Sequence, residues 1–202
     1  MNQTGEVQNE KTQLRRLLRD RRRSLFSAEV TEKSRLILER LLGVAPFLHA
    51  QTIVLYSADE NEVQTEAIWH EAVRQNKAVY YPRITTDKTN LEFVRRLSGH
   101  QLVPGTFGIL IPPGNDLLAS VSETDVVLTP GVGFDHYGHR LGRGRGYYDR
   151  AFRGVLAGAL RIALAYESQL VSAIPMAADD EPVHVIVTEM RLIHCVAESP
   201  HL

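Results

Sequence analysis

Residues 125–150 read DVVLTPGVGFDHYGHRLGRGRGYYDR, and this stretch decides the fold. It opens on a short apolar run at 125–128 that is typical of a buried strand, and a helix is predicted to begin near its end. Ligands of open α/β sheets bind where the chain leaves the carboxyl end of a strand. The stretch therefore predicts an α/β domain with a ligand site in this loop. Six glycines occupy it, at positions 131, 133, 138, 142, 144 and 146.

The composition of the loop indicates an anion site. Glycine allows positive φ and lets successive backbone N–H groups converge on an anion, and the start of the next helix adds its dipole. The spacing matches neither the dinucleotide fingerprint nor the P-loop. Spacing alone leaves two other interpretations open, a glycine-rich turn with solvated arginines and an RNA-contacting patch. The basic residues in or just after the loop are Arg140, Arg143, Arg145, Arg150 and Arg153.

The chain before this stretch begins with a predicted helical hairpin. Apolar residues between 8 and 26 form a thin stripe on an otherwise basic helix. Ser27 is predicted to cap a second helix that ends at Gly43.

The remaining pattern predicts a three-layer α/β domain, with a mostly parallel sheet between helices and the hairpin laid against it. A helix is expected at 65–75, and residues 97–124 are expected to form a long surface connection. We expect one domain over residues 1–202, with flexible ends at 1–10 and 198–202. The other predicted strands are 52–57, 78–81 (ending at Pro82), 91–95, 161–165 and 185–188.

Composition excludes several classes of protein. The 202 residues are 44% hydrophobic, and 23 Lys and Arg balance 24 Asp and Glu to a net charge of -1, which argues against nucleic-acid or membrane partners. No stretch is apolar enough to span a membrane, and the single cysteine, Cys195, is typical of a reducing compartment. We expect a cytoplasmic protein.

The string FDHYGHRLGRGRGYYDR, preceded by DVVLTPGVG, resembles the signature of the 5-formyltetrahydrofolate cyclo-ligase (5,10-methenyltetrahydrofolate synthetase) family. Four further segments are similar to that family and occur in the same order. They are the Lys-x-x-Leu-Arg of 11–15, the Glu-x-x-Thr of 62–65, Phe-Gly-Ile at 107–109 with Pro112, and Asp-Glu-Pro at 180–182. The resemblance implies a NagB/RpiA/CoA-transferase-like fold.

The resemblance also implies a reaction. ATP, with Mg²⁺, would phosphorylate the formyl oxygen of 5-formyltetrahydrofolate, N10 would attack the activated carbon, and phosphate would leave to give 5,10-methenyltetrahydrofolate and ADP. Catalysis would consist mostly of positioning and charge neutralisation. We expect a monomer acting on a folate with or without a polyglutamate tail.

The same resemblance implies roles for individual residues. Arg145 and Tyr148 would be catalytic, and Asp149 with Asp180 would hold Mg²⁺. The expected nucleotide-binding residues are Lys11, Arg15, Arg140, Gly142, Arg143, Gly144, Arg145, Gly146, Tyr147 and Tyr148. The expected folate-binding residues are Tyr56, Glu62, Arg143, Gly144, Arg145, Gly146 and Tyr147.

Other interpretations of the acids stay open. Asp149 could be a helix-dipole acid paired with Arg153, and Glu62 could be a helix N-terminal acid. The sequence departs from the family by one extra residue before Glu62, which leaves Glu60 as the competing position. Asp179 similarly competes with Asp180.

Three weaker alternatives remain. Asp135, His136 and His139 could be metal ligands, although no fourth ligand has suitable spacing. A sugar-phosphate isomerase or a transferase could use a similar α/β scaffold. A non-enzymatic nucleic-acid binder could use the basic helix and the RGRG loop, which the net charge disfavours.

Overall fold

The computed structural model describes residues 3–196 and is built on a seven-stranded sheet with the order β11-β10-β9-β6-β1-β2-β3. The five central strands are parallel, and both edge strands, β3 and β11, are antiparallel to their neighbours. The mostly parallel sheet of the sequence analysis is therefore confirmed. The strands of this sheet are β1 (Thr52–Val54), β2 (Ala78–Ile84), β3 (Leu91–Arg95), β6 (Val126–Thr129), β9 (Leu160–Leu164), β10 (Val185–Val187) and β11 (Leu192–His194).

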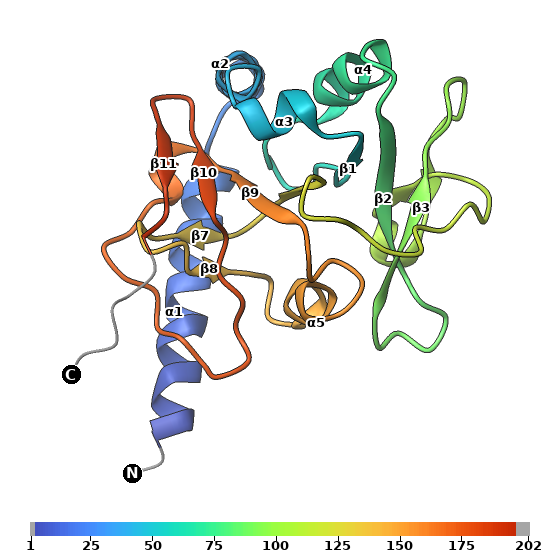
Figure 1. Ribbon diagram of the computed structural model, residues 1–202. Coiled ribbons are helices and arrows are strands. Elements are labelled where there is room, and N and C mark those ends of the chain that lie inside the picture. Colours follow the sequence, from blue (N-terminus) through green and yellow to red (C-terminus); the bar gives the residue numbers. More distant parts are fainter. Residues whose placement is uncertain (1–2, 197–202) are drawn as a thin grey trace.

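Helices cover both faces of the sheet, which gives three layers (Figure 1). One side carries α2 (Ser27–Leu41), α3 (Ala45–His49) and α4 (Glu66–Arg74). The other side carries α1 (Gln3–Arg23), α5 (Tyr147–Arg153) and a small hairpin of β7 (Gly133–Phe134) and β8 (Arg140–Leu141). No helix within residues 3–196 is long and apolar enough to cross a membrane.

Strand β6 shows why the sheet is covered on both faces. All four of its residues are buried. Val126 and Leu128 pack with α2, α3 and α4, whereas Val127 packs against Phe152 of α5. A strand that is apolar on both faces is stable only between two layers, so this run of sequence selects the central position in the sheet.

Helix α1 lies across the small hairpin. Leu18 is fully buried among Val132, Leu141 and Ile174. Gly133 allows this close contact, because a Cβ added there would lie 2.3 Å from the Cδ1 atom of Leu18. The basic face of α1 is thereby held beside the glycine-rich loop.

The helix boundaries at the N-terminus differ from the sequence prediction. Helix α1 begins at Gln3 rather than at residue 8, and its first turn carries Glu6, which favours a helix start. The cap of α2 is Phe26 rather than Ser27, because the carboxylate of Glu29 accepts a hydrogen bond from the Phe26 N–H. The expectation for residues 198–202 falls outside the described residues.

Two other segments also differ from the prediction. Strand β2 continues through Pro82 to Ile84, because its pairing with β1 ends at Tyr80 and only β3 lies beside it beyond that point. The predicted long connection contains a short antiparallel hairpin of β4 (Val103–Pro104) and β5 (Leu110–Ile111), joined by a 3₁₀ turn at Thr106–Gly108. We call residues 103–111 the flap hairpin.

Candidate active site

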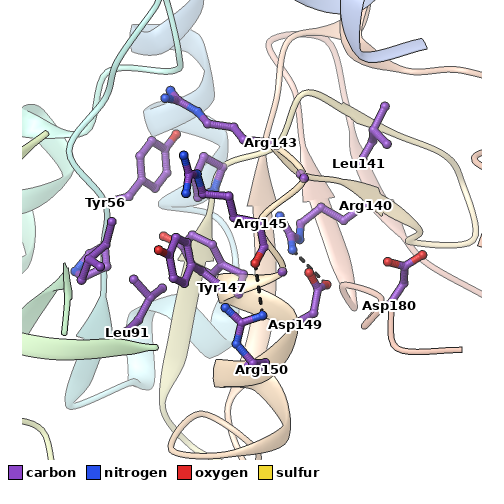
Figure 2. Close-up of a pocket in the computed structure, with 18 of the residues that line it drawn as sticks. Tyr56, Leu91, Arg140, Leu141, Arg143, Arg145, Tyr147, Asp149, Arg150 and Asp180 are labelled. Carbon is purple, nitrogen blue, oxygen red and sulfur yellow. Dashed lines mark hydrogen bonds and ion pairs between the residues drawn. The ribbon is translucent and has the colours of Figure 1, made fainter. Parts of the chain in front are cut away.

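A cleft of about 710 Å³ lies at the carboxyl ends of β1 and β6. Its walls come from α1, the loop after β1, the flap hairpin and the glycine-rich loop. Figure 2 shows the lining residues of the glycine-rich loop together with Tyr56 and Leu91. All the site residues expected from the sequence line this one cleft, although they are spread over 170 positions of the chain. They are Lys11, Arg15, Tyr56, Glu62, Arg140, Gly142, Arg143, Gly144, Arg145, Gly146, Tyr147, Tyr148, Asp149 and Asp180.

The glycine-rich loop depends on glycine at two positions above all. Gly144 and Gly146 have φ angles of 98° and 66°, a region that other residues rarely adopt. Gly146 is also the N-terminal cap of α5. These backbone angles direct Arg143 and Arg145 to the cleft and start the helix that carries Tyr147, Tyr148 and Asp149.

Helix α1 contributes two cations to the cleft. Lys11 is buried and forms an ion pair with Asp180, whose carboxylate also accepts the N–H of Ala177. Arg15 donates from Nε to the carbonyl of Gly142 over 2.9 Å. The start of the chain is therefore joined to both the glycine-rich loop and the loop before β10.

Asp149 faces the cleft and pairs with Arg140. The Nη2 atom of Arg140 lies 3.0 Å from Oδ1 of Asp149, and the N–H of Glu181 donates to the same oxygen. Arg153 pairs with Asp179 instead, so the alternative pairing of Asp149 with Arg153 is not formed between side chains. Asp179 and Asp180 both line the cleft.

Glu62 is the buried acid of the opposite wall. Its Oε1 atom accepts a hydrogen bond from Arg143 over 3.0 Å, and its Oε2 atom accepts the Asp59 N–H over 3.1 Å. Burial raises the pKa of the Glu62 carboxyl, and Arg143 and Arg22 oppose that rise. Glu60 points away to Arg19 and Arg23, so Glu62 is the acid that the structure brings to the cleft.

Three tyrosines line the cleft in different states. The hydroxyl of Tyr56 donates to the carbonyl of Val63 and that of Tyr147 to the carbonyl of Lys88. The Tyr148 hydroxyl is buried and has no hydrogen-bond partner in the described part of the chain. Burial raises the pKa of Tyr148, so its hydroxyl stays protonated at neutral pH.

The flap hairpin and the β2–β3 turn add residues to the cleft that were not among the expected site residues. Phe107 is exposed, and the Arg145 guanidinium lies 4.6 Å from the centre of its ring. Ile84 and Leu91 face each other in register and form an apolar wall. Leu91 lay in a predicted strand and Ile84 beyond the predicted end of one, and neither position carried a sequence signal for a site.

The metal site considered around Asp135 is not formed. The carboxylate of Asp135 is fully buried and accepts the N–H groups of Tyr137, His139 and Ile174. His136 is exposed, and residues 3–196 contain no group of three or more His, Cys, Asp or Glu that could hold a metal. Burial also raises the pKa of the Cys195 thiol to about 12, which makes it a poor nucleophile.

Comparison with known proteins gives the family. The family model described as the 5-formyltetrahydrofolate cyclo-ligase family matches residues 7–189. The chain belongs to this family. The cyclo-ligase resemblance of the sequence, the enzyme class that it implies and the fold are confirmed at this level.

Individual cyclo-ligases match over nearly their whole length. The chain is 29% identical to the mouse 5-formyltetrahydrofolate cyclo-ligase over 91% of this chain and 95% of the relative. It is 30% identical to the Haemophilus influenzae enzyme over 87% of this chain and 95% of that relative. The solved structure of Aquifex aeolicus 5,10-methenyltetrahydrofolate synthetase superposes with a TM-score of 0.80, at 29% identity, over 95% of this chain and 96% of that one.

Proposed function

We propose that this cyclo-ligase converts 5-formyltetrahydrofolate and ATP into 5,10-methenyltetrahydrofolate, ADP and phosphate, with Mg²⁺. The observation that carries the proposal is the cleft itself, which has a buried carboxylate on one wall and a cationic glycine-rich loop on the other. A folate ring presents N–H donors and a nucleotide presents phosphates, so the two walls suit the two substrates.

The cationic side would bind the nucleotide. ATP supplies the phosphoryl group that turns the formyl oxygen into a leaving group. Lys11 and Arg15 would contact its phosphates from α1, and Arg143 and Arg145 would do so from the glycine-rich loop, where guanidinium groups match phosphate oxygens in two places.

Asp149 and Asp180 suit Mg²⁺ with phosphates as partners. In the described part of the chain, one oxygen of each carboxylate accepts no protein hydrogen bond: Oδ2 of Asp149 and Oδ1 of Asp180. Mg²⁺ in nucleotide sites commonly takes one or two carboxylates and completes its shell with phosphate oxygens and water. Bound there, the ion would neutralise charge on the phosphates.

The opposite wall would bind the folate. The Glu62 carboxylate would accept two hydrogen bonds from the amino and N–H groups of the pterin, and Tyr56 and Tyr147 would pack against its rings. The unpartnered hydroxyl of Tyr148 is a protonated donor, and we propose that it hydrogen-bonds the formyl oxygen. Arg145 would stabilise the charge that develops during phosphoryl transfer.

The test is an absorbance assay of the purified protein with 5-formyltetrahydrofolate, ATP and Mg²⁺. The band of the conjugated methenyl product should grow only when all three are present, and Glu62→Gln should weaken folate use more than ATP use. Folded protein that binds ATP but forms no product would contradict the proposal. We also propose a cytoplasmic monomer, since one chain supplies every expected site residue and holds a single cysteine.

A further inference from the structure

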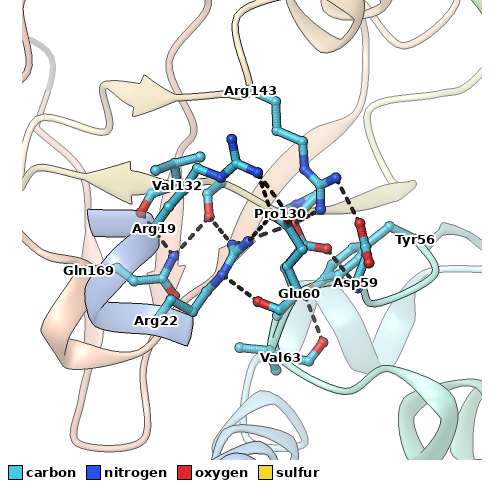
Figure 3. A network of polar contacts seen from close by, with 12 residues as sticks. Arg19, Arg22, Tyr56, Asp59, Glu60, Val63, Pro130, Val132, Arg143 and Gln169 are labelled. Carbon is cyan, nitrogen blue, oxygen red and sulfur yellow. Dashed lines mark hydrogen bonds and ion pairs between the residues drawn. The ribbon is translucent and has the colours of Figure 1, made fainter. Parts of the chain in front are cut away.

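Among the described residues Arg22 is the largest fully buried side chain, yet it does not line the cleft. Figure 3 shows its polar contacts. It is only 1% exposed, and α1 carries it to the rear of the wall that holds Glu62. A buried charge is costly unless other groups compensate it, so a guanidinium at this position calls for a function.

The contacts of Arg22 join the two loops that form the floor of the cleft. Nη1 donates to the carbonyl of Gly131 over 3.1 Å and lies 3.5 Å from Oε1 of Glu62. Nε donates to the carbonyl of Glu60 over 3.0 Å, whereas Nη2 has no hydrogen-bond partner in the described residues and lies 3.7 Å from Oε2 of Glu60, an ion-pair distance. Arg22 therefore touches the loop after β1 and the loop after β6 at once.

Glu62 has two cationic neighbours, and they differ in what else they can do. Arg143 is partly exposed, lines the cleft and can turn to a bound phosphate. Arg22 is enclosed behind Glu62 and cannot reach a ligand. When Arg143 binds phosphate, Arg22 remains as the cation beside the buried carboxylate.

We infer that Arg22 is a positioning residue that keeps Glu62 ionised and aimed into the cleft for the folate ring. This inference rests on the proposed function. A protonated Glu62 would present an O–H where the pterin also presents donors, so loss of the cation would weaken folate binding and leave the nucleotide end unchanged. The charged or titratable groups that face Glu62 are Tyr56, Asp59, Glu60, Arg22, Arg143, Tyr148 and Tyr166.

The test compares Arg22→Met with Arg23→Met, a neighbouring arginine of α1 that pairs with Glu60 on the surface. The Michaelis constants for 5-formyltetrahydrofolate and MgATP are measured from pH 6 to pH 9. Arg22→Met should raise the folate constant about tenfold or more at neutral pH, and the increase should shrink as rising pH ionises Glu62. Arg23→Met should change the folate constant by less than about twofold, and neither variant should change the MgATP constant by more than that. The folate constant of Arg22→Lys should lie between those of wild type and Arg22→Met.

A second comparison needs no substrate. A neutral amide at position 62 needs no neighbouring cation, so the double variant Arg22→Met/Glu62→Gln should be more stable to urea than Arg22→Met alone. A protein that holds a buried acid with a raised pKa becomes less stable as pH rises. The difference in unfolding free energy between the double variant and Arg22→Met should therefore widen from pH 5 to pH 8. If Arg22→Met folds poorly, recovery of folding in the double variant still tests the inference.

Two results would overturn the inference. One is a folate constant in Arg22→Met that rises equally at every pH. The other is a loss of folding in Arg22→Met and Arg22→Lys that Glu62→Gln does not relieve, which would make Arg22 only a structural tie to the carbonyls of Gly131 and Glu60. A wild-type protein that forms no methenyl product would instead overturn the proposed function.

Discussion

Asp149 contacts only residues at the proposed nucleotide end of the cleft, so a change there distinguishes that end from the proposed folate end. Its partners are Arg140 and the N–H of Glu181, and neither belongs to the wall around Glu62. A change at Asp149 should therefore affect the nucleotide and leave the folate almost untouched. Kinetic constants measured for each substrate separately can detect this difference.

Asp149→Asn should raise the Michaelis constant for MgATP by at least about tenfold, because a metal ligand loses its charge. Folate binding, measured by fluorescence titration, should change less than about twofold. Asp116→Asn is the matched control, since that acid is 53% exposed, pairs with Arg95 and lies outside the cleft. Equal losses for both substrates would exclude Asp149 as a metal ligand.

Arg145 is predicted to act in turnover rather than in stability. It is exposed, its guanidinium lies over the ring of Phe107, and it forms no ion pair within residues 3–196. Arg145→Ala should lower kcat by about a hundredfold, as expected for a lost donor to transition-state charge, and leave Tm almost unchanged. Arg21→Ala, an exposed position on α1 outside the cleft, should affect neither. A collapsed Tm in Arg145→Ala would show a structural role.

Among the elements, α1 depends on its close contact with the β7–β8 hairpin. Gly133→Ala would place a methyl group against Leu18 and should cost about 1–3 kcal/mol in urea unfolding. It should also raise the Michaelis constant for MgATP, because α1 carries Lys11 and Arg15. Gly158→Ala, which meets only ordinary contacts, is the control. A double-mutant cycle with Leu18→Ala should show coupling, and strict additivity would contradict the contact.

Glu60, in the loop after β1, also forms ion pairs with Arg19 and Arg23 of α1, and these ion pairs should weaken in acid. Partial burial raises the pKa of Glu60, but hydrogen bonds from Arg23 and Arg19 outweigh it and lower the pKa to about 2. The stabilisation is complete above the ordinary value of 4.5 and is lost as pH falls toward 2.

The measurement for these ion pairs is the free energy of urea unfolding of wild type and Glu60→Gln. The advantage of wild type should shrink by about 1–2 kcal/mol between pH 6 and pH 3. The same difference at both pH values would contradict the assignment to Glu60.

The sequence pattern predicted the elements best where a residue type fits only one structural setting. The apolar run of β6 and the glycines of the loop placed the sheet and the cleft, because only a central strand is buried on both faces and only glycine adopts φ near 98° comfortably. Pro82 misled the prediction, since its effect depends on whether a neighbour strand is present. Arg22 resembled a solvated helix residue, because nothing in a basic helix tells which arginine faces inward.

In the whole molecule, the cleft joins segments that lie far apart in the chain, so bound ligands should stabilise the fold. A non-hydrolysable MgATP analogue at about 100 times its Kd should add about 2.7 kcal/mol and raise Tm by about 5–10 °C. Thermal scanning of wild type and Asp149→Asn, with and without Mg²⁺, measures this. A shift that does not depend on Mg²⁺ in wild type would contradict the metal assignment.

The ion pair between Lys11 and Asp180 sets an order of events during synthesis. The two residues are 169 positions apart, so α1 leaves the ribosome long before its partner exists. At about 5–20 residues per second, this wait lasts on the order of ten seconds or more. For the first part of that time, until residues 133–141 have been made, Leu18 also lacks the hairpin that covers it. A nascent chain therefore cannot complete the nucleotide end of its site until five of the seven strands of the sheet have been made.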